Sequence, residues 1–95
     1  DAGYRIEVVA LDIPPGRAIP WHTHPGTEIV RMIEGEVEVW RDGLPALQLR
    51  AGEFLKVERG LVHGGRNPTG RLAKAVITYI IDAGQPQRIP ADPPD

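Results

Sequence analysis

Apolar residues occur along the chain in short runs, and Gly- and Pro-containing turn signals separate one run from the next. Hydrophobic and polar residues alternate with a period of two in several runs, which is typical of β-strands with one buried face. No window carries the 3.6-residue stripe of an amphipathic helix. We therefore predict an all-β protein with a closed barrel or jelly roll. The eight runs predicted to be strands are residues 5–13, 18–24, 28–33, 36–40, 46–49, 53–57, 61–65 and 72–81.

The length bounds the domain organisation. A chain of 95 residues is too short for two hydrophobic cores, so we predict a single domain over residues 1–95. From about residue 85 the chain carries four prolines. This composition predicts an extended tail that lies on the surface or reaches a neighbouring molecule.

Two of the predicted strands are apolar on both faces. Val8 and Val9 are adjacent in the first run, and residues 77–81 of the last run are mostly apolar. Since the interior of one barrel takes only one face of a strand, the second face predicts contact with another copy, and hence a homodimer. Ordinary exposed apolar surface is the alternative.

Composition and charge exclude several functions. Eleven basic and thirteen acidic residues give a net charge of −2, without the basic cluster that nucleic-acid binding requires. Neither Cys nor Ser is present, which argues against disulfides and covalent acyl chemistry. No apolar run reaches the roughly 18–20 residues of a membrane span, so we expect a soluble domain. Its compartment, cytoplasmic or periplasmic, stays open because the chain starts without Met and a removed leader is possible.

Candidate chemistry concentrates on the histidines. His22 and His24 share one face of a predicted strand, and Glu28 follows after another even separation. His63 comes from a distant run, and the fold must bring it to the same place. Three imidazoles and one carboxylate would suit Fe, Mn, Co, Ni, Cu or Zn. The alternative is that each histidine is a half-buried polar side chain with a structural partner.

Glycines frame both histidine segments at regular spacings. The first segment reads Gly16, five residues, His22-Thr23-His24, three residues, Glu28, six residues and Gly35; the second reads Gly52, seven residues, Gly60, two residues, His63, three residues and Asn67. These spacings resemble the two signature motifs of the cupin family. Glu58 stands where the second motif usually has proline, so we expect a less rigid turn there and unaffected ligands.

The resemblance implies a cupin double-stranded β-helix in which His22, His24, Glu28 and His63 bind one divalent transition metal. A six-coordinate metal would keep two positions open for water, substrate or dioxygen. Open positions favour catalysis over a structural metal, whose site is usually closed. The identity of the metal is left open among Fe, Mn, Ni, Zn, Co and Cu.

Strand parity predicts which side chains share the cavity with the metal. Tyr79 is the candidate catalytic residue, as a proton donor, although packing in the core with its hydroxyl at the rim is the alternative. The predicted pocket residues are Val30, Met32, Leu61, Ala75, Ile77 and Tyr79.

These features together favour a metal-dependent enzyme that acts on a small organic substrate, as a dioxygenase-like oxidoreductase. A metal-dependent isomerase or lyase is an alternative on the same fold. A non-catalytic module that binds a small molecule or senses metal is another, and a metal that only stabilises the barrel is a third.

Overall fold

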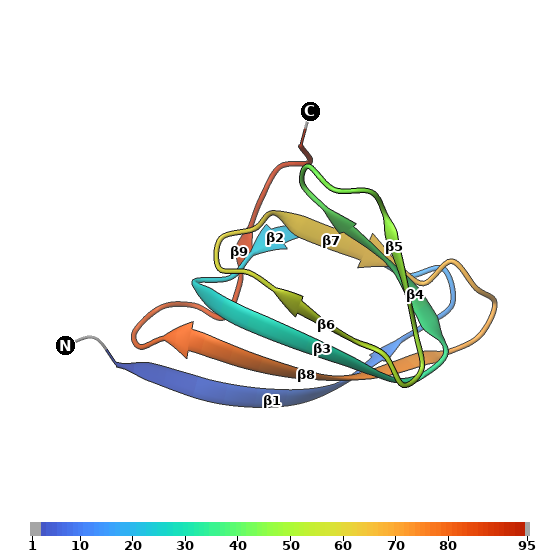
Figure 1. Cartoon of the computed structure of the whole chain (residues 1–95), viewed down its shortest axis with the longest axis horizontal. Coiled ribbons are helices and arrows are strands. Elements are labelled where there is room, and N and C mark those ends of the chain that lie inside the picture. The colour runs from blue at the N-terminus through green and yellow to red at the C-terminus, as the bar shows by residue number, and fades with distance from the viewer. Residues whose placement is uncertain (1–2, 95) are drawn as a thin grey trace.

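The computed structural model describes residues 3–94 and contains nine β-strands and no helix over that range. The strands form two antiparallel sheets that face each other, in the orders β1-β8-β3-β6 and β5-β4-β7-β2-β9 (Figure 1). This jelly-roll arrangement confirms the predicted all-β fold class. The strand bounds are β1 Tyr4–Ile13, β2 Ala18–Thr23, β3 Gly26–Glu34, β4 Glu36–Arg41, β5 Leu47–Arg50, β6 Phe54–Val57, β7 His63–Arg66, β8 Ala73–Asp82 and β9 Ile89–Pro90.

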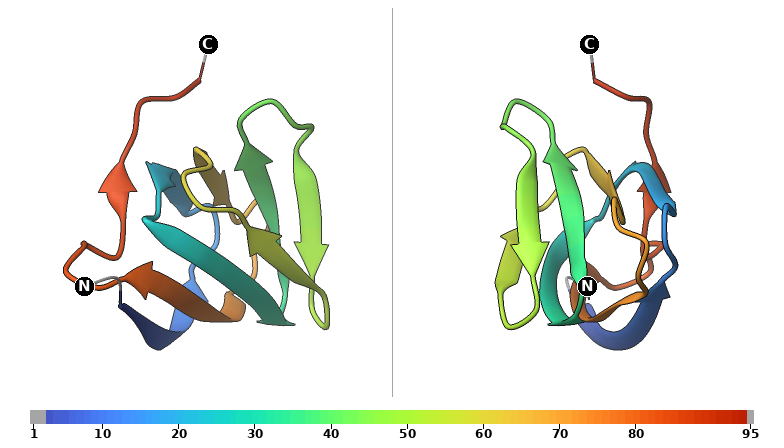
Figure 2. Two further views of the ribbon diagram at one scale, coloured as in Figure 1. Left: turned by 60° about the vertical axis from the view of Figure 1, so that its left-hand side comes forward. Right: turned by 90° about the vertical axis from the view of Figure 1, so that its right-hand side faces the viewer.

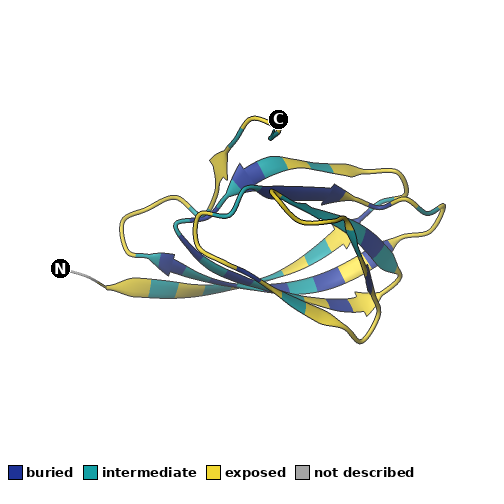
Figure 3. Ribbon diagram, turned by 45° about the horizontal axis from the view of Figure 1, so that its top comes forward, coloured by how far each residue is buried: buried dark blue, intermediate teal, exposed yellow. Residues whose placement is uncertain are grey.

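The interior of the barrel is filled by the alternating faces of the strands. Along β8 every second residue is buried, starting with Ala73 and ending with Ile81, while the residues between them are more exposed (Figure 3). Met32 on β3, Val37 on β4, Ile13 on β1 and Leu49 on β5 belong to the same core between the two sheets. The period-two pattern in the sequence therefore marks the buried face correctly.

Glycine in the left-handed conformation explains the spacing of the two motifs. Gly16, Gly35, Gly52 and Gly60 have φ angles of 72°, 75°, 89° and 74° and lie in the connections β1–β2, β3–β4, β5–β6 and β6–β7. Side chains with a Cβ rarely adopt this backbone conformation. The motif glycines thus fix the turns, and the turns fix which residues of each strand face inward.

The turn after β7 is held by a buried asparagine. The Nδ2 group of Asn67 donates hydrogen bonds to the carbonyl oxygens of Ile13 (2.9 Å) and Arg71 (2.7 Å). Its Oδ1 accepts hydrogen bonds from the amide (2.9 Å) and the hydroxyl (2.7 Å) of Thr69. Asn67 therefore joins the end of β1 to the loop before β8.

Most strand bounds differ from the sequence prediction by one or two residues, and two differences bear on the site. Strand β9 pairs with β2 and adds a ninth strand within the proline-rich segment (Figure 2). Strand β7 begins at His63, whereas the predicted run began at Leu61. Within residues 3–94, the structure has no helix long and apolar enough to cross a membrane.

Candidate metal centre

Four buried side chains from both sheets converge at one point inside the barrel. His22 and His63 lie opposite each other on the paired strands β2 and β7. Glu28 enters from the other sheet, on β3, and His24 follows directly after β2. One ligand atom from each of the four residues lies within 4.8 Å of the others. The predicted ligands are thus close enough to hold a single ion.

Gly26 allows strand β3, which carries Glu28, to approach strand β8 closely. Gly26 begins β3 where it pairs with Ile81 of β8. A Cβ at position 26 would lie 1.9 Å from the carbonyl oxygen of Ile80, so only glycine permits this approach of the two strands. The strand that carries Glu28 is therefore held close to β8.

Backbone carbonyls orient all three imidazoles. Because a carbonyl oxygen can only accept, each Nδ1 carries the proton, and a neutral ring then presents an unprotonated Nε2. Backbone groups of this kind are common partners of metal-ligating histidines. The acceptors are Pro20 for His22 (2.7 Å), Gln87 for His24 (2.7 Å) and Leu61 for His63 (2.8 Å).

Acceptor atoms face one another at the centre of the cluster. Glu28 Oε1 lies 2.9 Å from His63 Nε2 and 3.1 Å from His24 Nε2. The Nε2 atom of His24 is buried and has no hydrogen-bond partner. Lone pairs at these distances require a positive charge between them, either a proton on an imidazole or a metal ion. The donor set therefore fits a divalent transition metal.

Electrostatics favour the metal-binding protonation states of His22 and Glu28. Burial, as the largest cause, lowers the pKa of His22 to about 4, and the charges of His63 and Arg88 act in the same direction. Burial would raise the pKa of Glu28, but its interactions with His24 and His63 outweigh burial and lower this pKa to about 2. At neutral pH His22 is therefore a neutral ligand and Glu28 an anionic one.

The cluster opens onto a small, mostly apolar cavity of about 80 Å³. This volume accommodates a ligand of only a few non-hydrogen atoms. The structure places five of the six predicted pocket residues in its wall: Val30, Met32, Ala75, Ile77 and Tyr79.

Leu61 is the exception among the predicted pocket residues, because it is not part of the cavity wall. It lies in the turn before β7, where the alternation of a strand does not apply. Leu61 contributes to the site through its backbone carbonyl, which orients His63.

Tyr79 lies beside the ligands. Its ring centroid is 5.0 Å from that of His24, and it pairs across the strands with Glu28. Burial and the charge of Glu28 raise the pKa of Tyr79 to about 12. The hydroxyl group therefore stays protonated at neutral pH and can act as a donor.

The sequence prediction missed the contribution of the C-terminal segment to the site. Gln87 supplies the carbonyl that orients His24, and Arg88 lines the cavity. Strand β9, which holds this segment in place, has only two residues and contains a proline. Neither periodicity nor spacing distinguishes it from an extended tail.

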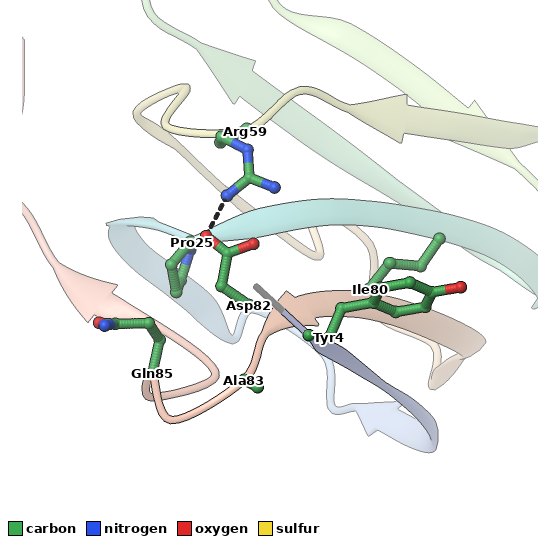
Figure 4. Close-up of a pocket in the computed structure, with 8 residues that line it drawn as sticks. Tyr4, Pro25, Arg59, Ile80, Asp82, Ala83 and Gln85 are labelled. Carbon is green, nitrogen blue, oxygen red and sulfur yellow. Dashed lines mark hydrogen bonds and ion pairs between the residues drawn. The ribbon is translucent and has the colours of Figure 1, made fainter. Parts of the chain in front are cut away.

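A larger hollow of about 440 Å³ lies elsewhere, near the start of β1 and the end of β8 (Figure 4). Arg59 and Asp82 form an ion pair of 2.6 Å at its edge, and both side chains are exposed. Since solvent screens such a pair and the potential ligands are buried in the barrel, the smaller cavity is the candidate site.

Comparison with known proteins places the chain in a family. The model of the cupin domain matches residues 9–82, and the chain belongs to the cupin family. Auxin-binding protein ABP19a from Prunus persica is 36% identical over 82 residues, which cover 81% of this chain and 39% of that protein.

Two solved structures are also similar. One is DMSP lyase DddQ from Ruegeria pomeroyi DSS-3, with a TM-score of 0.77 and 26% identity over 85% of this chain and 41% of that chain. The other is an oxalate oxidase in complex with the substrate analogue glycolate, with a TM-score of 0.71 and 30% identity over 78% of this chain and 41% of that chain. The chain thus spans about two fifths of the length of ABP19a and of these two enzymes.

Proposed function

We propose that this cupin is a metal-dependent enzyme that oxidises a small organic substrate with dioxygen. The observation that carries the proposal is the convergence of four buried ligand atoms within 4.8 Å beside an apolar cavity. Four protein ligands leave positions open on a metal that prefers six. Open positions are what a metal needs in order to take part in a reaction.

The residues of the chain have separate tasks in this proposal. His22, His24, Glu28 and His63 would hold the metal, which when bound supplies a Lewis acid and a redox centre. The apolar wall limits access of water and strengthens polar interactions inside the cavity. The protonated hydroxyl of Tyr79 is available to donate a hydrogen bond or a proton to a substrate oxygen.

Similarity to an oxalate oxidase supports the oxidative reaction. That enzyme is bound to glycolate, a ligand of five non-hydrogen atoms, and the cavity of about 80 Å³ suits a ligand of similar size. The match covers most of this chain but less than half of the oxidase, so the substrate of this chain is part of the proposal.

Nitric oxide tests for an open metal position without knowledge of the substrate. We expect the Fe(II)-loaded protein to bind nitric oxide under anaerobic conditions and to show the paramagnetic signal of an iron nitrosyl. His22→Ala, which removes a ligand, should lose both iron and signal. Full iron loading without nitric oxide binding would exclude the proposed reaction. Oxygen uptake with a panel of small hydroxy and carboxylic acids then tests turnover.

A metal-dependent lyase is the second candidate, and the similarity to DMSP lyase DddQ favours it. Tyr79 suits this reaction as well, since elimination needs a group that exchanges protons near the metal. Turnover under anaerobic conditions separates the two, because a lyase continues without dioxygen and an oxidoreductase of the proposed kind stops. Binding without turnover in either condition would favour a non-catalytic module.

We also propose that the protein forms a homodimer through the outer face of the β1-β8-β3-β6 sheet. Tyr4, Ile6 and Val8 point outward from β1 and are exposed, and Phe54 is exposed on β6. Strand β1 lies at one end of the sheet and, within residues 3–94, pairs only with β8. A long edge strand with an apolar face is a surface that a second copy can cover.

Sedimentation equilibrium tests the dimer. The wild-type protein should have twice the mass of the 10.4 kDa chain. Val8→Lys should sediment as a monomer, because it places a charge in the interface, whereas Leu44→Lys in the distant β4–β5 loop should remain dimeric. A monomeric wild type, or a dimer that Val8→Lys does not disrupt, would contradict this surface.

A further inference from the structure

Arg88 brings a permanent positive charge to the wall of the metal cavity. It lines this cavity together with three potential ligands, namely His22, Glu28 and His63. No other Arg or Lys side chain belongs to the wall as the described residues form it. The remaining wall is mostly apolar, so Arg88 is the one permanent cation among the described residues that line the cavity.

The backbone holds Arg88 in place from both sides. On one side, the carbonyl of Gln87 accepts a hydrogen bond of 2.7 Å from His24. On the other side, Ile89 and Pro90 pair with Thr23 and His22 of β2. The backbone of Arg88 is therefore fixed relative to two of the metal ligands, even though its side chain is exposed.

The charges around the cavity favour an anion. A divalent metal and the Glu28 carboxylate together carry a charge of about +1, because histidine binds metal as a neutral ring. Arg88 raises this to about +2, although solvent screens its exposed side chain more than it screens the buried charges of the metal and Glu28. A neutral ligand would gain at most a hydrogen bond from Arg88, whereas an anionic ligand would be attracted by the charges of both the metal and the guanidinium group.

We propose that Arg88 selects a small carboxylate as the ligand of this site. A guanidinium group donates two parallel hydrogen bonds to a carboxylate, a geometry that lysine does not match. The cavity of about 80 Å³ limits the ligand to a few non-hydrogen atoms. This inference rests on the proposed function because it assumes that a metal occupies the four-ligand cluster.

Direct binding measurements test Arg88 independently of turnover. Co(II)-loaded protein is titrated with acetate and lactate, and with the neutral counterparts acetamide and propane-1,2-diol, by calorimetry and by the visible spectrum of Co(II). The variants are Arg88→Gln and Arg88→Lys. Arg71→Gln serves as the control, because Arg71 is exposed and lies outside the cavity wall. Cobalt content is measured for every variant.

We expect Arg88→Gln to weaken carboxylate binding roughly tenfold or more, since hydrogen bonds to charged groups are among the stronger ones. Arg88→Lys should recover part of the loss, and Arg71→Gln should bind like the wild type. Cobalt content and the weak binding of neutral probes should stay the same in all variants. The hydrogen bond from His24 is accepted by the backbone carbonyl of Gln87, so the substitutions at Arg88 leave it in place.

Two outcomes separate this inference from the proposed function. Unchanged carboxylate affinity in Arg88→Gln, at full cobalt content, would overturn the role of Arg88 and leave the proposed oxidation standing. Carboxylate binding that depends on Arg88, in a protein that consumes no oxygen with any redox-active metal, would support Arg88 and overturn the proposed oxidation.

Discussion

Two buried polar clusters of this protein differ in how far their hydrogen bonds are satisfied. The side chain of Asn67 is fully hydrogen-bonded. Its Nδ2 group donates to two carbonyls, and its Oδ1 accepts from the amide and the hydroxyl of Thr69. In the other cluster, Nε2 of His24 has no partner and lies 3.1 Å from the carboxylate of Glu28. Both clusters belong to the same pair of sequence motifs.

This difference in hydrogen bonding indicates the role of each cluster. A satisfied buried polar group stabilises the fold, because removing it leaves its partners without hydrogen bonds. An arrangement of acceptors without donors costs free energy unless a cation binds among them. We therefore assign a structural role to Asn67 and a metal-binding role to the four-ligand cluster, and variants can separate the two roles.

The largest effect is expected for His63→Ala, which removes one of four ligands. Metal affinity should fall by about 1,000-fold, or about 4 kcal/mol, while the protein stays folded. Equilibrium dialysis followed by elemental analysis measures the affinity, and circular dichroism checks the fold. Full metal content in this variant would show that the ion binds elsewhere.

The opposite pattern is expected for Asn67→Ala. The carbonyl of Ile13 and the amide of Thr69 would lose their side-chain partner, and the carbonyl of Arg71 would keep only the Thr69 hydroxyl, which should lower the free energy of unfolding by about 3 kcal/mol. Urea denaturation measures this loss, and the folded fraction should still bind one metal per chain. Thr69→Val, which removes only the hydroxyl group, should cost about 1 kcal/mol. If Asn67→Ala lost metal binding but kept its stability, the structural role assigned to Asn67 would be wrong.

Acid should destabilise the metal-free protein through the ligand cluster. The pKa of His22 is about 4 in the folded chain against an ordinary value of 6.5, so the unfolded chain binds more protons between these values. Stability should therefore fall as the pH falls from about 6.5 to about 4. Glu28, whose pKa is lowered from 4.5 to about 2, extends the loss to lower pH.

Thermal unfolding of the metal-free protein at a series of pH values measures this dependence. His22→Gln should flatten the curve between about pH 6.5 and 4, because glutamine does not titrate. An equally steep curve in this variant would exclude His22 as the cause.

The smallest effect is expected for Glu58→Pro, in the turn that leads to His63. Glu58 accepts a hydrogen bond from Leu61, and Gly60 has a φ of 74°, which defines a tight turn. Proline restricts the unfolded chain and should raise the stability by about 0.4–1 kcal/mol, with unchanged metal affinity. Chemical denaturation checks the first value and dialysis the second. A loss of stability would show that position 58 does not suit proline in this chain.

The sequence was sufficient to predict eight of the nine strands in residues 3–94, the turns between them and the four residues of the buried cluster. Alternating residues marked the inward face of β8, and the framing glycines proved to be turns with positive φ. His22 and His24 were placed on one face because strand geometry leaves few alternatives. These features depend on local periodicity and on fixed spacing, which a single sequence contains.

The contribution of the C-terminal segment could not be predicted, because it depends on contacts between distant residues. His24 and Gln87 are 63 residues apart, and only the folded chain brings the carbonyl to the imidazole. Arg88 belongs to a segment whose prolines favour an extended tail as much as a strand. Leu61 was misplaced for a related reason, since β7 begins two residues later than its apolar run.

The visible spectrum of the Co(II)-loaded protein tests the central claim most directly, because it reports the number of bound metals and their coordination together. We predict one cobalt per chain with the weak absorption of a six-coordinate ion, in which the four protein ligands leave two positions for exchangeable water. Intense absorption typical of a tetrahedral ion would indicate a closed structural site, and the absence of cobalt binding would contradict the metal centre itself.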